Sequence, residues 1–150
     1  MAWLRSWRPA IGWAATIWIF STELFSSQST AWLLFPLLHW LLPNASATTL
    51  MLWHIRIRKS AHLAEFFIFS LLVLRGIRGG RAGWRLTWGL ASVAIAADYA
   101  ALDEVHQAFV PTRGASALDA LLDSLGAAIA QAFAWWRSSR VVKISQRLSI

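Results

Sequence analysis

The chain has no cysteine, a single tyrosine and few charged side chains for its 150 residues. Without cysteine, disulfide bonds and thiolate metal sites are both excluded, and the redox compartment is left undetermined. Charged residues make up 14% of the sequence, whereas a soluble domain of this size usually carries about 25%. The scarcity of charge indicates that much of the surface faces lipid, and the length suits one domain over residues 1–150.

The residues that are abundant also indicate a membrane protein. Hydrophobic residues make up 57% of the chain, the mean hydropathy is +0.50, and there are 11 tryptophans. Several tryptophans stand beside basic residues or at the ends of apolar runs, where indole rings favour the membrane–water interface. These are Trp3, Trp7, Trp84, Trp88, Trp135 and Trp136. Packing in an ordinary protein core is the alternative interpretation.

The net charge of +7 leaves a nucleic-acid partner as a second interpretation. The basic residues, however, gather beside apolar segments, where they would meet anionic lipid headgroups. The sequence contains no zinc finger, helix-turn-helix or other recognisable nucleic-acid module. We therefore expect membrane lipids as partners and no nucleic acid.

The apolar segments predict an all-α integral membrane bundle of about four transmembrane helices. The expected spans are 10–25, 60–74, 84–109 and 116–136. Segment 31–42 is shorter than the roughly 20 residues that cross a bilayer and contains Pro36, so we expect a short surface or re-entrant helix in the first outer loop. Glu23 and the lack of a clear cleavage site favour an uncleaved first helix over a signal peptide. A basic tail begins at about residue 138.

The basic residues set the orientation of the four-span arrangement. One side would hold 10 of them and the other side 4, which places both termini in the cytoplasm. The larger set is Arg5, Arg8, Arg75, Arg78, Arg81, Arg85, Arg137, Arg140, Lys143 and Arg147, and the smaller set is Arg56, Arg58, Lys59 and Arg113. A fifth span through 31–42 would leave 6 inside against 8 outside, so four spans fit better.

The seven acidic residues were not used to choose this orientation, yet all of them fall toward its outer side. They are Glu23, Glu65, Asp98, Asp103, Glu104, Asp119 and Asp123. A charged side chain at the centre of a spanning helix costs roughly 2.5–3.5 kcal/mol on insertion scales, so several together need partners. Ionisable residues in spanning segments usually mark a functional site.

The spacing of the polar residues supplies such partners. Side chains that are three or four residues apart along a helix lie on the same face. The matching sets are Lys59, His62 and Glu65; Asp103 and Glu104 with Gln107; and Asp119 with Asp123, with Arg113 in the loop before them. We therefore expect one polar pocket among three helix ends. Gly126, Ala130 and Ala134 continue the Asp119–Asp123 row and favour close helix packing.

These residues resemble three motifs of the VanZ-like membrane proteins. The matching stretches are Lys59-x-x-His62-x-x-Glu65-Phe66, Asp103-Glu104-x-x-Gln107-x-Phe109-x-Pro111-x-Arg113 and Asp119-x-x-x-Asp123-x-x-Gly126. The chain departs from the family pattern at Asp123, where the pattern has asparagine. The resemblance implies a multi-span protein of the cell membrane. The family is named for a member linked to teicoplanin resistance, which makes glycopeptide antibiotic resistance a function to consider.

Three functions remain open from the sequence. The first is a pocket facing the outside that binds a lipid headgroup, a cell-envelope precursor or an amphiphilic glycopeptide. Its residues would be Lys59, His62, Glu65, Asp103, Glu104, Gln107, Arg113, Asp119 and Asp123. Lys59 and Arg113 would contact phosphate, and the acids would hold these cations or meet an amine of the ligand.

The second function is a membrane-embedded enzyme that acts on a lipid-linked substrate by acid–base chemistry. Its catalytic candidates are His62, Glu65, Asp103 and Glu104. A metal ion could find nitrogen and oxygen ligands in His62, Glu65, Asp103 and Asp119, but the spacing matches no established metal motif and we predict no metal site. The cofactor is undetermined, and a homo-oligomer is left open. The third interpretation is a purely structural charge cluster that fixes helix packing.

Overall fold

The computed structural model describes residues 2–111 and 113–148, and within this part of the chain it is all-α. Its elements are α1 Ala2–Phe20, the short 3-10 helix η1 Glu23–Phe25, α2 Ser27–Leu41, α3 Ala47–Arg78, α4 Leu86–Ala108 and α5 Ala117–Leu148. The all-α prediction is confirmed. The predicted basic tail continues α5 up to Leu148, and its last two residues lie outside the described range.

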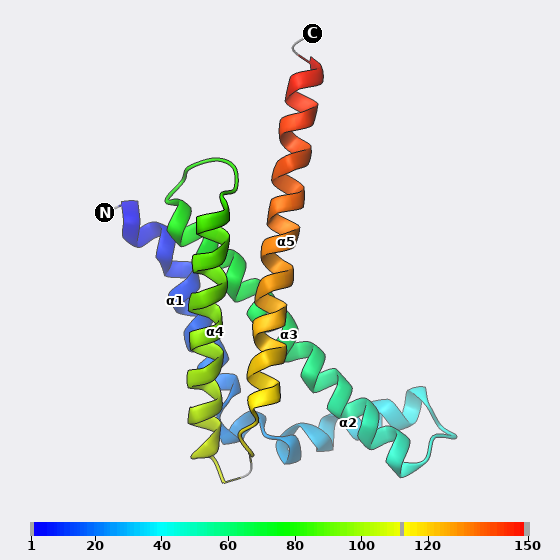
Figure 1. The fold of residues 1–150 in the computed structure, drawn as a ribbon. Helices are drawn as coiled ribbons and strands as arrows, with labels where there is room; N and C mark the ends of the chain where they lie inside the picture. Colours follow the sequence, from blue (N-terminus) through cyan, green and yellow to red (C-terminus); the bar gives the residue numbers. More distant parts are fainter. Residues whose placement is uncertain (1, 112, 149–150) are drawn as a thin grey trace.

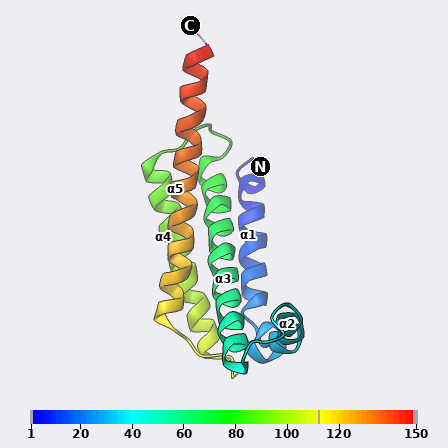
Figure 2. The ribbon, with the colours of Figure 1, turned by 90° about the vertical axis from the view of Figure 1, so that its right-hand side faces the viewer.

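Four long helices run beside one another in the bundle (Figure 2). The N-terminus, the α3–α4 connection and the C-terminal part of α5 lie at one end, and α2 and the α4–α5 connection lie at the other. Helix α3 contacts all four other helices and is the centre of the arrangement. Two helices, α3 and the part of α5 from Ala117 to Arg140, are long and apolar enough to cross a membrane.

Helix α3 is much longer than the predicted span 60–74. It begins at Ala47 because Ser46 caps it, with the Ser46 hydroxyl accepting a hydrogen bond from the Thr49 amide at 3.2 Å. No proline or glycine interrupts it until Gly76, and it ends at Gly79, whose φ of 56° is left-handed. The additional turns at its start extend away from the bundle (Figure 1).

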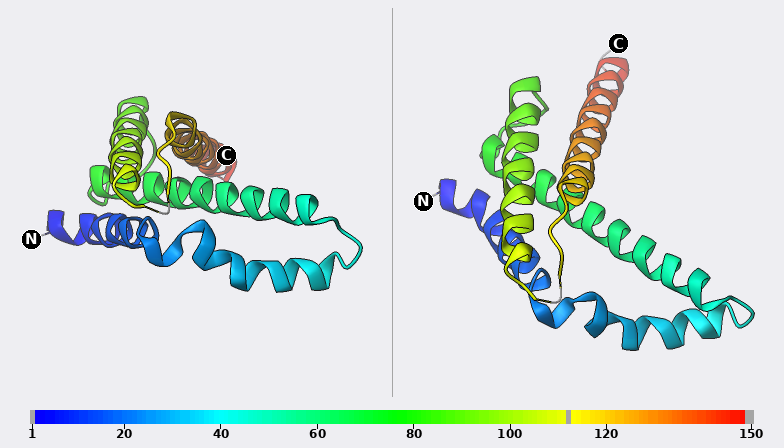
Figure 3. Two further views of the ribbon diagram at one scale, coloured as in Figure 1. Left: turned by 90° about the horizontal axis from the view of Figure 1, so that it is seen from below. Right: turned by 60° about the horizontal axis from the view of Figure 1, so that its bottom comes forward.

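These first turns of α3 pair with α2, and together residues 27–59 form a lateral arm (Figure 3). The two helices contact each other, and a buried His54 lies between them with its Nε2 atom 3.3 Å from the Thr30 hydroxyl. Segment 31–42, predicted to be a surface or re-entrant helix, lies within this arm and does not join the bundle. Many of the arm's large apolar side chains are exposed, including Trp32 and Trp40.

The core of the bundle is held by bulky residues on α3 and small ones on α4 and α5. Phe66 is fully buried, and Ala96, Ala100 and Ala127 face it as part of one apolar cluster. At Gly126 the backbones of α3 and α5 come so close that an added Cβ atom would lie 2.4 Å from the Leu63 carbonyl oxygen. Small residues at a helix crossing permit this approach.

Gly126→Ala should therefore lower the stability of the protein, because its methyl group would push α5 away from the α3 backbone. We expect a loss of about 1–3 kcal/mol in the free energy of unfolding, measured by thermal or chemical unfolding in detergent micelles. Gly12→Ala is the matched control, because an added Cβ there meets nothing within 4 Å. Equal stability of the Gly126→Ala protein and the wild type would contradict the close crossing.

Candidate functional site

A cavity of about 170 Å³ lies where α3, α4 and α5 meet the α4–α5 connection. Seven of the nine predicted ligand-binding residues line it: Lys59, His62, Glu104, Gln107, Arg113, Asp119 and Asp123. Its remaining lining residues are Arg58, Gly114 and Leu122. The motifs that lie far apart in the sequence are thus brought together at one end of the bundle.

Helix α3 presents its polar residues at intervals of three, so that they share one face. Lys59, the last residue of the arm, forms an ion pair with Asp119 on α5, and both side chains are partly exposed. One turn further along, His62 lies between two acids. Its Nδ1 atom is 3.7 Å from Glu65 Oε2 and 3.9 Å from Asp123 Oδ2. These distances are longer than hydrogen bonds, so the histidine is near both carboxylates without being bonded to either.

Glu65 and Asp103 do not line the cavity and instead contact residues that do. The Gln107 side-chain amide donates a hydrogen bond of 2.7 Å to Asp103 Oδ2. It also lies 3.4 Å from the Ser21 hydroxyl, which links α4 to the end of α1. Asp103 is completely buried, so this amide is an important local partner for its charge.

Arg113 joins the α4–α5 connection to the end of α1. Its Nη2 atom donates hydrogen bonds to the carbonyl oxygens of Phe20 at 2.6 Å and Phe25 at 2.7 Å. Burial lowers the pKa of the Arg113 guanidinium, as does the nearby charge of Arg58, whereas Asp103 raises this pKa. Arginine nevertheless stays charged in proteins, so Arg113 is a permanent cation at the cavity.

Glu104 has a related positioning role on the opposite side of the connection. Its Oε2 atom accepts a hydrogen bond of 2.6 Å from the backbone amide of Ser116, immediately before α5 begins. A carboxylate at this position satisfies a backbone donor and complements the positive end of the helix dipole. Together, Glu104 and Arg113 hold both sides of the short connection against the bundle.

Several buried polar atoms of the site have no hydrogen-bond partner within the described part of the protein. They are His62 Nδ1, Glu65 Oε2, Asp103 Oδ1, Asp123 Oδ1 and the Nε and Nη1 atoms of Arg113. Buried polar atoms are normally paired because leaving one unpaired is costly. Their concentration around one cavity marks it as a place where further polar atoms are needed.

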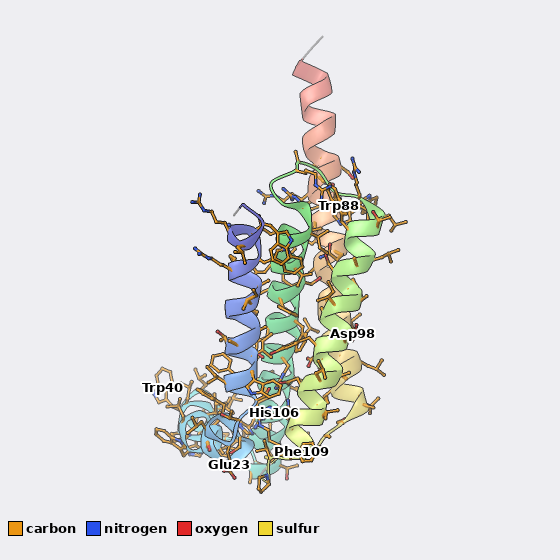
Figure 4. All side chains as sticks on the ribbon, turned by 90° about the vertical axis from the view of Figure 1, so that its left-hand side faces the viewer. Glu23, Trp40, Trp88, Asp98, His106 and Phe109 are labelled. Carbon is orange, nitrogen blue, oxygen red and sulfur yellow. The ribbon has the colours of Figure 1, made fainter. Side chains whose placement is uncertain are left out.

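Sequence reasoning missed three lining residues, Arg58, Gly114 and Leu122, and included two acids, Glu65 and Asp103, that do not line the cavity. Arg58 was assigned to the outer loop only, although its position four residues before His62 places it on the same helix face. Asp98 is exposed halfway along α4, away from the end marked by Phe109 (Figure 4). Glu23 is exposed on η1. Neither lines the cavity.

The geometry offers limited support for metal chemistry. Among the described residues, no three histidine or acidic side chains are grouped closely enough to hold a metal ion. His62, Glu65, Asp103 and Asp119 therefore do not form a ready ligand set in this conformation. The site combines a histidine, buried acids and fixed cations, which suits binding of a polar group or proton transfer.

Arg113→Lys should reduce stability even though the charge is kept, because one ammonium group cannot reproduce the position of the guanidinium nitrogen between two carbonyl oxygens. We expect a loss of about 1.5–3 kcal/mol in the free energy of unfolding. The exposed Arg5, at the other end of the bundle, provides the control Arg5→Lys. Thermal unfolding of the two variants compares them directly, and equal melting would argue against the Arg113 link.

Comparison with known proteins agrees with the motifs. Searches of curated proteins and of solved structures find no match to the chain. A sequence model described as VanZ/LLP1, however, matches residues 7–138. This region includes all the cavity-lining residues and most of the bundle. The chain therefore belongs to the VanZ/LLP1 family.

Proposed function

We propose that α1, α3, α4 and α5 each cross the membrane, with both termini in the cytoplasm and the cavity near the outer surface. Family membership and the two strongly apolar helices indicate a membrane protein. The side-by-side arrangement of the four long helices supports extending the spans to α1 and α4. The arm then lies along the outer interface, where its exposed tryptophans favour the boundary between lipid and water.

The distribution of basic residues supports this orientation. The end that carries the N-terminus and the α3–α4 connection is rich in arginine, as expected for the cytoplasmic side. Arginines there also lie over tryptophan rings. The Trp88 ring has Arg81 at 4.7 Å and Arg85 at 4.9 Å, and Arg140 lies 4.8 Å from the Trp136 ring. Such pairs suit the headgroup region of a membrane.

The cavity then functions as a binding site for the polar part of a membrane amphiphile. A lipid headgroup, a cell-envelope precursor and an amphiphilic glycopeptide are the ligand classes that fit. The observation that carries this proposal is the set of buried, unpartnered polar atoms around a charged cavity. A polar headgroup would supply hydrogen-bond donors and acceptors to the unpartnered atoms of the lining residues His62, Arg113 and Asp123. Teicoplanin-type resistance would follow if binding of the glycopeptide or its target altered the action of the drug.

The position of His62 favours one alternative, a membrane-embedded enzyme. His62 lies near both Glu65 and Asp123, and a histidine beside carboxylates is suited to act as a general base and then as a general acid. The reaction would be hydrolysis or transfer at a lipid-linked ester or phosphoester. The longer-than-bonding distances around the imidazole make binding the better-supported function.

Labelling of single cysteines tests the topology, because the chain has no cysteine of its own. Asn44→Cys places an exposed thiol between α2 and α3, and Ala82→Cys places one in the α3–α4 connection. In intact cells, a membrane-impermeant maleimide should label the first variant only, and the second should react after the membrane is opened. Labelling of Ala82→Cys in intact cells would contradict the four-span orientation.

Ligand retention tests the binding function. We expect native mass spectrometry of the protein released from native nanodiscs to show a bound amphiphile. Glu65→Gln and Asp103→Asn should reduce its retention about tenfold or more, since Glu65 lies near His62 and Asp103 accepts a hydrogen bond from Gln107, and both of these partners line the cavity. Asp98→Asn, which changes an acid outside the cavity, is the control. If no amphiphile is bound and the site variants only melt at lower temperature, the cluster is structural.

A further inference from the structure

We propose that the cavity binds the headgroup of an aminophospholipid, with the primary ammonium against Asp123 and the phosphate near Arg58 and Lys59. Phosphatidylethanolamine is the simplest lipid with this chemistry. The inference rests on the proposed binding function and narrows its ligand to one class. It follows from the charges, burial and hydrogen bonding of the residues that line the cavity.

The cavity wall carries equal numbers of the two charges. Three lining residues are cationic and three are acidic: Arg58, Lys59 and Arg113 against Glu104, Asp119 and Asp123. A purely anionic headgroup would satisfy the cations but would meet the acids at close range, where like charges repel. A zwitterionic headgroup satisfies both sets. Glu65 and Asp103 contact lining residues, which makes the surroundings of the wall more acidic.

Two of the lining acids lie deeper than Lys59. Asp123 is 1% exposed and Glu104 is 8% exposed, whereas the Lys59 side chain is 49% exposed. Asp123 and Glu104 thus lie on the buried side of the cavity, whereas Lys59 stands at its open side beside Asp119, whose side chain is 37% exposed. A headgroup that enters from the lipid surface would place its cationic tip among the acids. Its phosphate, which is attached to the glycerol, would remain near the basic residues.

One carboxylate oxygen of Asp123 is left for an added donor, while the other lies 3.9 Å from His62 Nδ1. Lys59 pairs with Asp119, and Arg113 uses Nη2 on two backbone carbonyl oxygens. Asp123 Oδ1 is buried and has no hydrogen-bond partner among the described residues. A primary ammonium has three N–H donors and a positive charge, so it can bond to this oxygen and neutralise the carboxylate.

The surface beside the cavity suits the acyl chains of a lipid. Leu122 lines the cavity on α5, and its neighbours Leu118 and Leu121 are 74% and 65% exposed. These leucines surround Asp119 on the first turns of α5, so an apolar strip begins at the cavity edge. A lipid could place its headgroup in the cavity and its chains along this strip. This favours a membrane lipid over free phosphoethanolamine, which shares the headgroup chemistry.

A series of lipids with equal acyl chains tests the inference. The wild-type protein in phosphatidylglycerol nanodiscs would receive, in separate samples, phosphatidylethanolamine, its N-methyl and N,N-dimethyl forms, and phosphatidylcholine. Native mass spectrometry measures how much of each lipid stays bound. We expect retention to fall as N–H donors are lost, by about tenfold or more between the first and last lipids. Free phosphoethanolamine in excess should not displace the bound lipid.

Asp123→Asn tests the proposed contact within the protein. It should remove the preference for phosphatidylethanolamine over phosphatidylcholine, whereas Asp98→Asn should keep it. Gel filtration and thermal unfolding would show that the variants are folded, and Glu104→Gln replaces Asp123→Asn if the latter does not fold. The lipid series with the wild-type protein decides the question even without a variant.

The outcomes separate this inference from the broader function. One outcome is that retention depends on Glu65 and Asp103 but is equal for all four lipids, or that phosphatidylglycerol is retained as well as phosphatidylethanolamine. This result would overturn the ammonium assignment and leave amphiphile binding intact. Displacement by free phosphoethanolamine would overturn the choice of a lipid. If no amphiphile is retained through the cavity residues, the proposed binding function fails together with the inference.

Discussion

The need to pair charges buried away from water determines how this bundle is built. Asp103 and Asp123 are almost completely enclosed, and an isolated carboxylate is very costly in such surroundings. Gln107 donates a hydrogen bond to Asp103, and His62 lies near Asp123. Gln107 and Asp103 are both on α4, whereas His62 on α3 and Asp123 on α5 come close only because these two helices meet at one end of the bundle. The cavity is the part of this meeting point that protein atoms leave incompletely paired.

The sequence predicted the helical character and much of the site because both depend on local periodicity. Residues three or four apart on a helix share a face, which was enough to group Lys59 with His62 and Asp119 with Asp123. The order of the predicted helices also placed Arg113 in the loop between two helix ends. The same rule could have identified Arg58. Asp98 was placed toward the outer side with the other acids, but it is exposed on α4 and does not line the cavity.

Other features could not be read from the sequence because they depend on tertiary contacts. Hydropathy marked the apolar centre of α3 but not its extension to Ala47, which follows from a serine cap and an uninterrupted helix. The link from Arg113 to the carbonyl oxygens of Phe20 and Phe25 spans most of the chain. Backbone carbonyl groups have no sequence signature, so nothing in the residue pattern selects these two as its partners.

The close crossing at Gly126 connects the packing of the bundle to the chemistry of the site. Gly126 meets the carbonyl oxygen of Leu63, the residue that follows His62, and Asp123 lies one turn before Gly126. The closeness of the two backbones therefore determines how near His62 comes to Asp123, now 3.9 Å at Nδ1 and Oδ2. A wider crossing would separate histidine from acid and enlarge the cavity at the same point. The small residue is thus part of the site's geometry, because helix packing and the distance between His62 and Asp123 depend on the same contact.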